Sequence, residues 1–428
     1  MGKSRLVVIS TIFSLVIGLA AGSQLVASAK SKSSGKSKAS KKSSSGKSVK
    51  SSKKSKTAKG GKSSRKQKSQ RVGKKMSKKE RAAARRAAAA ARRRELERLA
   101  AIRRYDEMLR TQAALNIAAD NVANEDPFVR SVSLSALGSR AGTVVVMDPN
   151  NGRVLSIVNQ RMAIGSALKP CSTIKPFVAL AALNEHLMDE SAARTLRTCN
   201  CEMEMDDALA YSNNEYFQQL GRQLGLQKVN EYEREFGLGQ VTGINLAGET
   251  PGHLPTDDSV ESGRIYSHGD GVGLTAIQLA SFVSTIANGG SLFQPQVVAP
   301  GHTFTPVLRR QIRIDPKNRT AVLEGMTGAV DYGTAKRAYD EEEHIAGKTG
   351  TCIGNGSWLG LFASFAGVDR PNLVVVVITQ GSSSRGKYAA DIAGQIYKGL
   401  ASRYGTTASR PRRTTETEVQ GVPTLGNR

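Results

Sequence analysis

The chain has 428 residues, of which 62 are Lys or Arg and 36 are Asp or Glu, so its formal net charge is +26. Residues 1–110 hold 33 of the basic and 5 of the acidic residues, which leaves 29 basic and 31 acidic residues for the rest. The length allows one to three domains. The excess of basic residues therefore lies in an N-terminal appendage, and the rest of the chain is close to neutral, so the protein is not uniformly cationic.

Residues 1–29 have the layout of a secretory signal peptide. Lys3 and Arg5 precede an apolar run from Leu6 to Ala21, and small residues follow from Ala27 to Ala29. Because the run is near the lower limit of about 17 residues for a membrane span, an uncleaved anchor is the alternative. Either interpretation predicts export to the periplasm or the outer face of the cytoplasmic membrane, where cysteines can pair.

Residues 30–76 form a tail rich in Lys and Ser, which we expect to be disordered because it cannot bury a core. Anionic membrane lipids or wall polymers are the expected partners of such a charge, and a solvated spacer is the alternative. Nucleic acid is not an expected partner, since no aromatic residues are interleaved for base stacking.

Residues 77–140 are predicted to form a long basic helix and a connector. Ser77 and Glu80 fit a capping box, and the following run of Ala, Arg, Leu and Glu lacks Gly and Pro. A narrow apolar stripe that begins at Leu96 and ends at Leu109 could dock on the next domain or pair with another helix.

Residues 141–405 read as one folded domain, followed by a polar tail at 406–428 that we expect to be disordered. Two runs rich in β-branched residues, separated by Asp148 to Gly152, predict a β-hairpin. A helical region follows, roughly from Ser172 to Asn288, and three more strand candidates and a last helix close the domain. The pattern predicts an α+β fold: a five-stranded antiparallel sheet from both chain ends, with an inserted helical subdomain.

Three short motifs lie in this domain: Ser172 with Lys175, Ser212 with Asn214, and Lys348-Thr349-Gly350-Thr351. Each is weak alone. The spacing of Ser172 and Lys175 recurs by chance in the tail, Ser-x-Asn is common in turns and helix caps, and Lys-Thr-Gly suits an exposed edge strand.

Together and in this order, the motifs resemble those of the penicillin-binding proteins, the serine D,D-transpeptidases of the bacterial cell wall, and their serine β-lactamase relatives. The segments "GTVVVMDPNNGRVLSIVN", "REFGLGQVTGINLAGETPGHLP", "GVGLTAIQLASFVSTIANGG" and "GAVDYGTAKRA" extend the resemblance over about residues 142–404. It implies a β-lactamase/transpeptidase-like fold, peptidoglycan stem peptides and β-lactams as partners, and a reaction without a cofactor or metal.

The resemblance also implies roles for the motif residues. Ser172 would be the nucleophile and Lys175 its base, with the pKa of Lys175 lowered by burial and by the positive charge of Lys348. Ser212 would pass a proton to the leaving amine, and Asn214 would hold the donor peptide.

In the third motif, Lys348, Thr349 and Thr351 would bind the terminal carboxylate of the substrate, and Gly350 would allow close approach of the strand. The backbone N–H groups of Ser172 and Thr351 would form the oxyanion hole.

The expected function is D,D-transpeptidation or D,D-carboxypeptidation through an acyl-enzyme on Ser172. A β-lactamase is one alternative, but no segment supplies the glutamate that activates water in class A enzymes, and Glu249 fits the transpeptidase pattern. A sensor that binds β-lactams or wall peptides without turnover is the other. The sequence does not separate transpeptidase from carboxypeptidase.

Two of the four cysteines flank the proposed oxyanion hole, because Cys171 precedes Ser172 and Cys352 follows Thr351. If those two N–H groups bind one oxygen atom, the cysteines lie near each other, and related carbapenem-hydrolysing β-lactamases carry a disulfide at the equivalent place. The resemblance therefore predicts a Cys171–Cys352 disulfide, with reduced core cysteines as the alternative. The pairing of Cys199 and Cys201 stays open.

Overall fold

The computed structural model describes residues 77–188, 196–198, 201–256 and 261–405. The predicted signal peptide or anchor, the Lys/Ser-rich tail and the C-terminal tail lie outside these ranges, as does Cys199. Within the described residues, no helix combines the length and the apolar character needed to cross a membrane.

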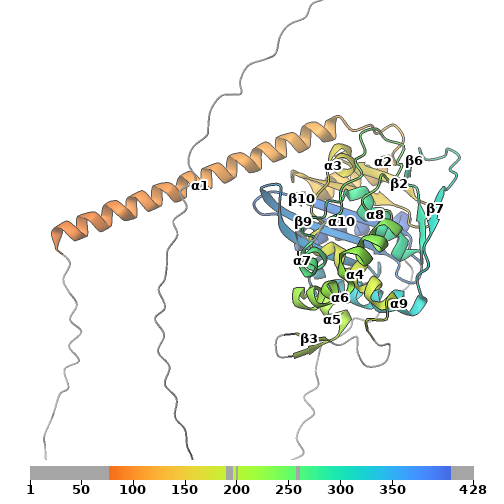
Figure 1. Ribbon diagram of the computed structural model, residues 1–428. Helices are drawn as coiled ribbons and strands as arrows, with labels where there is room; N and C mark the ends of the chain where they lie inside the picture. The colour runs from red at the N-terminus through yellow and green to blue at the C-terminus, as the bar shows by residue number, and fades with distance from the viewer. Residues whose placement is uncertain (1–76, 189–195, 199–200, 257–260, 406–428) are drawn as a thin grey trace, which may run out of the picture. The chain divides into compact units, whose positions relative to one another are not determined.

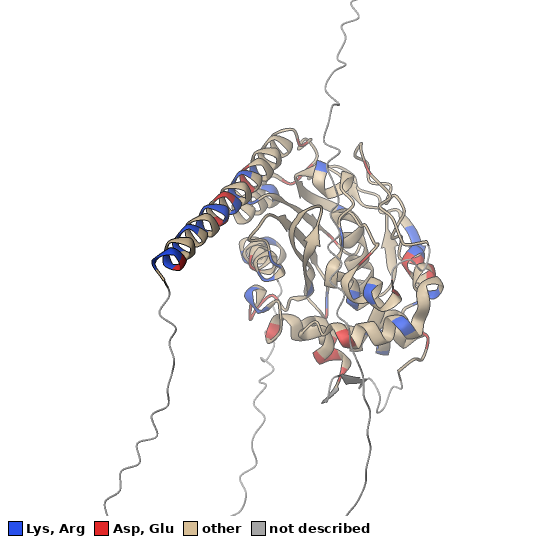
Figure 2. Cartoon of the chain, turned by 60° about the vertical axis from the view of Figure 1, so that its left-hand side comes forward, with Lys and Arg blue, Asp and Glu red and all other residues tan. Residues whose placement is uncertain are grey.

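Helix α1 (Lys78–Ala118) begins at the predicted capping box (Figure 1). The Ser77 side chain accepts a hydrogen bond from the Glu80 N–H at 3.2 Å, and the Glu80 carboxylate accepts one from the Ser77 N–H at 2.7 Å. Basic and acidic residues are distributed along the helix (Figure 2). Much of the predicted apolar stripe faces solvent, since Leu96 is 55% and Met108 is 54% exposed.

The central sheet has the strand order β6-β2-β1-β10-β9-β8. All five predicted strands are present: β1 (Gly142–Met147), β2 (Arg153–Val158), β8 (Ala346–Gly354), β9 (Ser357–Ala366) and β10 (Leu373–Gln380). Because β1 pairs antiparallel with both β2 and β10, the two ends of the domain meet in one sheet. The α+β fold with strands from both chain ends is confirmed.

The expected number of five strands is corrected to six. The additional strand β6 (Gln296–Val297) pairs parallel with β2, so the sheet is largely and not wholly antiparallel. A strand of two residues is too short to show the alternation of apolar and polar residues by which strands are predicted. Its pairing depends on contacts made by the rest of the fold.

Both faces of the sheet are covered, which explains the continuous apolar runs of its strands. Val144 and Val146 on β1 point to one core, formed with α10 (Gly386–Tyr404) and α2 (Pro127–Leu137). Val145 and Met147 point to the other core, which the helical subdomain fills from the opposite face. Figure 1 shows α8 (Ala276–Ala287) on this side of the strands.

The helical subdomain is interrupted by a short hairpin of β3 (Leu196–Thr198) and β4 (Cys201–Met203), which the sequence pattern does not predict. The other elements are α3 (Gln160–Gly165), η1 (Cys171–Ile174), α4 (Lys175–Asn184), α5 (Met205–Ala210), α6 (Asn214–Glu235), α7 (Ser262–His268), β5 (Ser291–Phe293), β7 (Leu308–Gln311), α9 (Pro316–Asp331) and η2 (Lys336–Ala338). Helix α4 is buried along almost its whole length, so it forms the centre of the subdomain.

Candidate active site

Ser172 lies on the 3₁₀ turn η1, directly before α4, and its side chain is partly exposed. The turn begins with Cys171 in the left-handed region at φ 51°, a costly conformation for a residue with a side chain. Gly269 packs against it so closely that a Cβ there would lie 2.9 Å from the Cys171 nitrogen. The surrounding packing therefore fixes the backbone on which Ser172 is presented.

Lys175 begins α4 one turn after Ser172 and is 0% exposed. Its ammonium nitrogen lies 2.7 Å from the Ser212 carbonyl oxygen, 3.1 Å from the Ser212 hydroxyl and 2.7 Å from the Asn214 side-chain oxygen. Burial lowers the pKa of Lys175 well below its ordinary value, and the nearby charge of Lys348 lowers it further. The first and second motifs thus meet at one buried amine.

The second motif lies where α5 is followed by α6, with Ser212 in the turn and Asn214 as the first residue of α6. The side chain of Asn213 caps α6 by accepting a hydrogen bond from the Tyr216 N–H at 2.9 Å. Ser212, at φ 59°, is the second non-glycine residue of the site in the left-handed region. This conformation turns both its carbonyl and its hydroxyl toward Lys175.

The third motif occupies the edge strand β8. Lys348 is 1% exposed, which excludes the alternative of a solvated charge on an edge strand. Burial lowers the pKa of Lys348 to about 7, and its ammonium donates to the Thr349 carbonyl at 3.2 Å. The Thr349 hydroxyl donates to the Thr334 hydroxyl at 2.7 Å, and the Thr351 hydroxyl accepts from the Gly386 N–H at 2.8 Å.

Gly350 brings β8 against the turn that carries Ser172. A Cβ at this position would lie 3.1 Å from the Pro170 carbonyl oxygen and 3.2 Å from the Cys171 Cβ, tighter than an ordinary contact. Two residues further along β8, Cys352 forms a disulfide with Cys171, and the two Cα atoms are 5.8 Å apart. The strand and the turn are therefore joined by close packing and by a covalent bond.

These elements enclose a cavity of about 540 Å³. It is lined by Ser172, Ser212, Asn214, Thr334, Thr349, Thr351, Arg385 and Lys387. The lining within the described residues offers hydroxyl groups and two cationic side chains but no carboxylate. Such a surface suits a substrate that carries a carboxylate. Nor do the described residues contain a group of three or more His, Cys, Asp or Glu side chains that could hold a metal ion.

The family model for the penicillin binding protein transpeptidase domain matches residues 142–398. The chain belongs to this family. The chain is 28% identical over 311 residues to stage V sporulation protein D of Bacillus subtilis, a match that covers 59% of this chain and 48% of that protein. It is 25% identical over 346 residues to the peptidoglycan D,D-transpeptidase MrdA of Acinetobacter baumannii, and this match covers 62% of this chain and 51% of that protein. The chain thus spans about half the length of these curated relatives.

The fold of the domain is similar to a solved structure, the apo transpeptidase domain of penicillin-binding protein 3 from Burkholderia pseudomallei. The TM-score is 0.57 at 19% sequence identity, and the match covers 65% of this chain and 95% of that chain. At this identity the likeness supports the fold.

Three residues that line the cavity of the transpeptidase domain were not singled out from the sequence. Thr334 lies within "GAVDYGTAKRA", but no chemical pattern marks it. Arg385 lies in the loop after the last strand and Lys387 at the start of α10, and two cations at these positions give no chemical signal in the sequence. The sequence therefore predicts the candidate catalytic residues of the cavity better than the other side chains that line it.

Proposed function

We propose that this protein is a serine D,D-transpeptidase that cross-links peptidoglycan stem peptides through an acyl-enzyme on Ser172. The observation that carries the proposal is the environment of Lys175, a fully buried amine with a lowered pKa between the nucleophile turn and the second motif. A buried lysine of this kind holds a neutral fraction at physiological pH and can act as a base.

In the first half of the reaction, the Ser172 oxygen bonds to the carbonyl carbon of the penultimate D-Ala, and its proton passes to neutral Lys175. The Ser172 and Thr351 N–H groups stabilise the oxyanion of the tetrahedral intermediate. The C–N bond then breaks, and terminal D-Ala leaves as an amine that receives a proton by way of Ser212. Ser212 is suited to this step because its hydroxyl is 3.1 Å from the Lys175 nitrogen.

In the second half, an amine of another stem peptide attacks the Ser172 ester and loses a proton to the same lysine. An amide bond forms, the Ser172 oxygen regains its proton, and the cross-link is complete. Water as the acceptor would give a D,D-carboxypeptidase with the same first step. Asn214, which accepts from Lys175 at 2.7 Å, is placed to orient the donor peptide next to the ester.

The third motif and the rim cations would bind the terminal carboxylate of the donor. Thr349 and Thr351 offer hydroxyl groups, and Arg385 and Lys387 add positive charge at the same cavity. Lys348 is buried, and its contribution to the site is that its positive charge lowers the pKa of Lys175.

A β-lactamase is disfavoured by the surroundings of Glu249. Its carboxylate accepts hydrogen bonds from the Thr242 N–H at 2.5 Å, the Thr242 hydroxyl at 2.6 Å and the Gly243 N–H at 3.0 Å. Glu249 is thus engaged in holding a turn, and the described lining of the cavity offers no carboxylate to activate water. Slow release of a bound penicillin is the expected consequence.

The proposed activity is tested by incubating the full chain with a D-Ala-D-Ala stem pentapeptide and an amine acceptor, with product analysis by mass spectrometry. We expect release of D-Ala and an amide-linked dimer, and neither product from Ser172→Ala. Release of D-Ala without a dimer would indicate a carboxypeptidase. Penicillin binding without any turnover of the peptide would favour the sensor and contradict the proposal.

We also propose that the chain is exported and acts at the outer face of the cytoplasmic membrane or in the periplasm. The layout of residues 1–29 supports this location, since a charged start precedes an apolar run. A fusion of residues 1–29 to a reporter that is active only outside the cytoplasm tests it. An inactive reporter would contradict export.

A further inference from the structure

The C-terminal half of α1 contacts two loops that lie beside the third motif. The Tyr105 hydroxyl donates to the Asn355 carbonyl oxygen at 3.3 Å, in the turn between β8 and β9. Asp106 accepts from the Ser382 N–H at 2.8 Å and also from the Ser382 hydroxyl, in the loop between β10 and α10. Residues about 250 positions away in the sequence are thus joined to one turn of α1.

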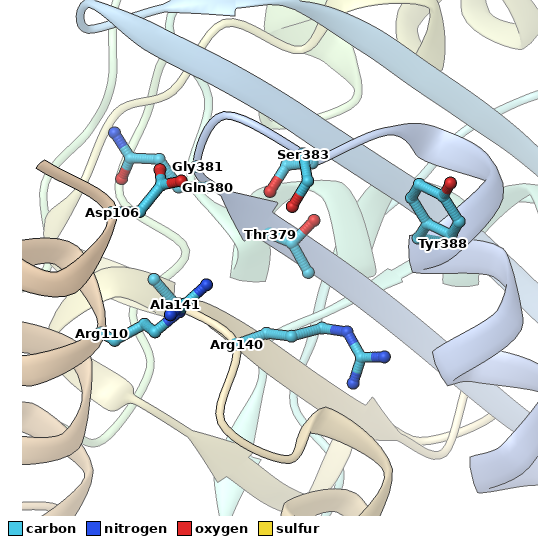
Figure 3. A pocket seen from close by; sticks show the side chains of 10 residues that line it. Asp106, Arg110, Arg140, Ala141, Thr379, Gln380, Gly381, Ser383 and Tyr388 are labelled. Atoms are coloured by element: carbon cyan, nitrogen blue, oxygen red, sulfur yellow. The ribbon is translucent and has the colours of Figure 1, made fainter. Parts of the chain in front are cut away.

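The contact between Asp106 and Ser382 borders a second cavity of about 230 Å³ between α1 and the end of β10. Figure 3 shows the Asp106 carboxylate next to Gly381 at the start of the loop, with Ser383 further along it. Both carboxylate oxygens of Asp106 are used by Ser382. The carboxylate therefore holds the backbone and the side chain of one loop residue.

The same loop carries Arg385, which lines the catalytic cavity. The Arg385 guanidinium donates to the Ser382 carbonyl at 3.2 Å and to the Ser384 carbonyl at 2.6 Å. On its other side it lies over the ring of Trp358 at 3.9 Å. Ser382 therefore links the two side chains, because its N–H donates to Asp106 and its carbonyl accepts from Arg385.

The next residue links the loop to the third motif itself. The Gly386 N–H donates to the Thr351 hydroxyl at 2.8 Å, and a Cβ on Gly386 would lie 2.8 Å from the Gly350 carbonyl oxygen. A shift of the loop would therefore move both Arg385 and the group that orients the Thr351 hydroxyl.

We propose that Asp106 is a positioning residue, which through Ser382 fixes Arg385 and Thr351 for binding of the substrate carboxylate. This inference rests on the proposed function. It makes α1 part of the substrate-binding apparatus, although no residue of α1 lines the described catalytic cavity. The Asp106 carboxylate thereby connects the basic helix α1 to the residues that would bind the substrate.

The test compares Asp106→Ala with Glu107→Ala in the full chain. Glu107 is the matched control, because it is an exposed acid on the same helix whose ion-pair partner is Arg110 at 3.6 Å. We expect Asp106→Ala to raise KM for the stem pentapeptide about tenfold, since a charged hydrogen-bond pair is lost, with little change in kcat. Glu107→Ala leaves both constants unchanged, and Asp106→Asn, which keeps one acceptor oxygen, restores most of the loss.

A double-mutant cycle separates positioning from a general loss of stability. Because Asp106 acts in part through Arg385, Asp106→Ala raises KM by a smaller factor in an Arg385→Ala background than in the wild type. Independent, additive effects of the two substitutions would overturn the proposal. Ser382→Ala replaces Asp106→Ala in the cycle if the latter does not fold, because it removes one of the two bonds and leaves the other.

Trp358 provides a readout that does not depend on activity, because it is the one tryptophan of the chain. Arg385 covers its ring, so release of the loop by Asp106→Ala increases quenching of its fluorescence by acrylamide, and Glu107→Ala does not. Unchanged quenching and unchanged KM in Asp106→Ala would refute the inference alone. If the wild-type chain neither bound penicillin nor turned over peptide, but Asp106→Ala still increased quenching, the proposed function would be refuted. The contact between Asp106 and the loop would stand.

Discussion

The side-chain nitrogen of Lys175 lies 2.7 Å from the side-chain oxygen of Asn214, so the first and second motifs share a buried hydrogen bond. The same nitrogen contacts both oxygens of Ser212. A lysine with three oxygen partners is held in one orientation, although burial opposes its charge. Lys175 is thus both the structural link between the motifs and the candidate base.

The base role of Lys175 predicts a characteristic dependence of acylation on pH. Lys175 is active as the neutral amine, and burial and the charge of Lys348 lower its pKa, so the rate of penicillin acylation rises with pH well below 10.5. Lys175→Ala slows acylation by about 10²- to 10⁴-fold, the usual contribution of a general base. Stopped-flow acylation from pH 5 to 10 tests this, and a rise that begins only near 10.5 would contradict the role.

Lys348 is predicted to cost stability at neutral pH. Its pKa is about 7 in the folded protein and near 10.5 when unfolded, so between these values the unfolded state binds the extra proton. The free energy of unfolding therefore falls as pH decreases from about 10.5 to 7, and then stays level for this group. Urea denaturation of Lys348→Met is expected to show less of this fall than wild type.

The control for this experiment is Lys398→Met, which removes an exposed lysine on α10. We expect it to keep the wild-type dependence on pH. An identical fall in Lys348→Met and wild type would show that burial of Lys348 carries no such cost.

The Cys171–Cys352 disulfide is predicted to stabilise the domain by restricting the unfolded chain. The two residues are 181 positions apart, and the chain-entropy model assigns about 5 kcal/mol to a loop of this length, less any strain. Cys352→Ala should therefore lower the free energy of unfolding by several kcal/mol and make the melting temperature insensitive to reductant. A non-reducing peptide map that finds free thiols at both positions in the purified protein would contradict the bond.

The Lys/Ser-rich tail is predicted to bind anionic surfaces without affecting the chemistry. Deletion of residues 30–75 is expected to leave the acylation rate unchanged and to weaken retention on vesicles that contain anionic lipid or on isolated walls. Retention of the full chain should fall as salt rises, because exposed charges are screened. Equal retention of both proteins would show that the tail is a spacer.

The sequence predicted what short-range patterns encode. The short apolar runs of β1, β2, β8, β9 and β10, several of them rich in β-branched residues, are local signals in the sequence, so these strands could be found. The capping box at Ser77 is likewise a local signal. The motif residues Ser172, Ser212 and Lys348 were identified by the resemblance to the family, and their roles in the reaction stay predictions.

Features that depend on distant contacts were not predicted. Strand β6 exists because β2 pairs with it, and its two residues carry no pattern of their own. Asp106 and Ser382 are 276 positions apart, and an Asp in a basic helix gives no sign of its partner. Arg385 lies in a loop that contacts α1 through Ser382 and β8 through Gly386, and neither contact has a local signal in the sequence. Burial of Lys348 on an edge strand also required the packing of the whole domain.

The most direct test of the account is the mass of the full chain after incubation with benzylpenicillin. We predict one covalent adduct with the mass of the intact antibiotic, located by peptide mapping on the peptide that contains Ser172, and no adduct on Ser172→Ala under the same conditions. A wild-type chain without an adduct, or a Ser172→Ala chain that still carries one, would contradict the assignment of Ser172 as the nucleophile.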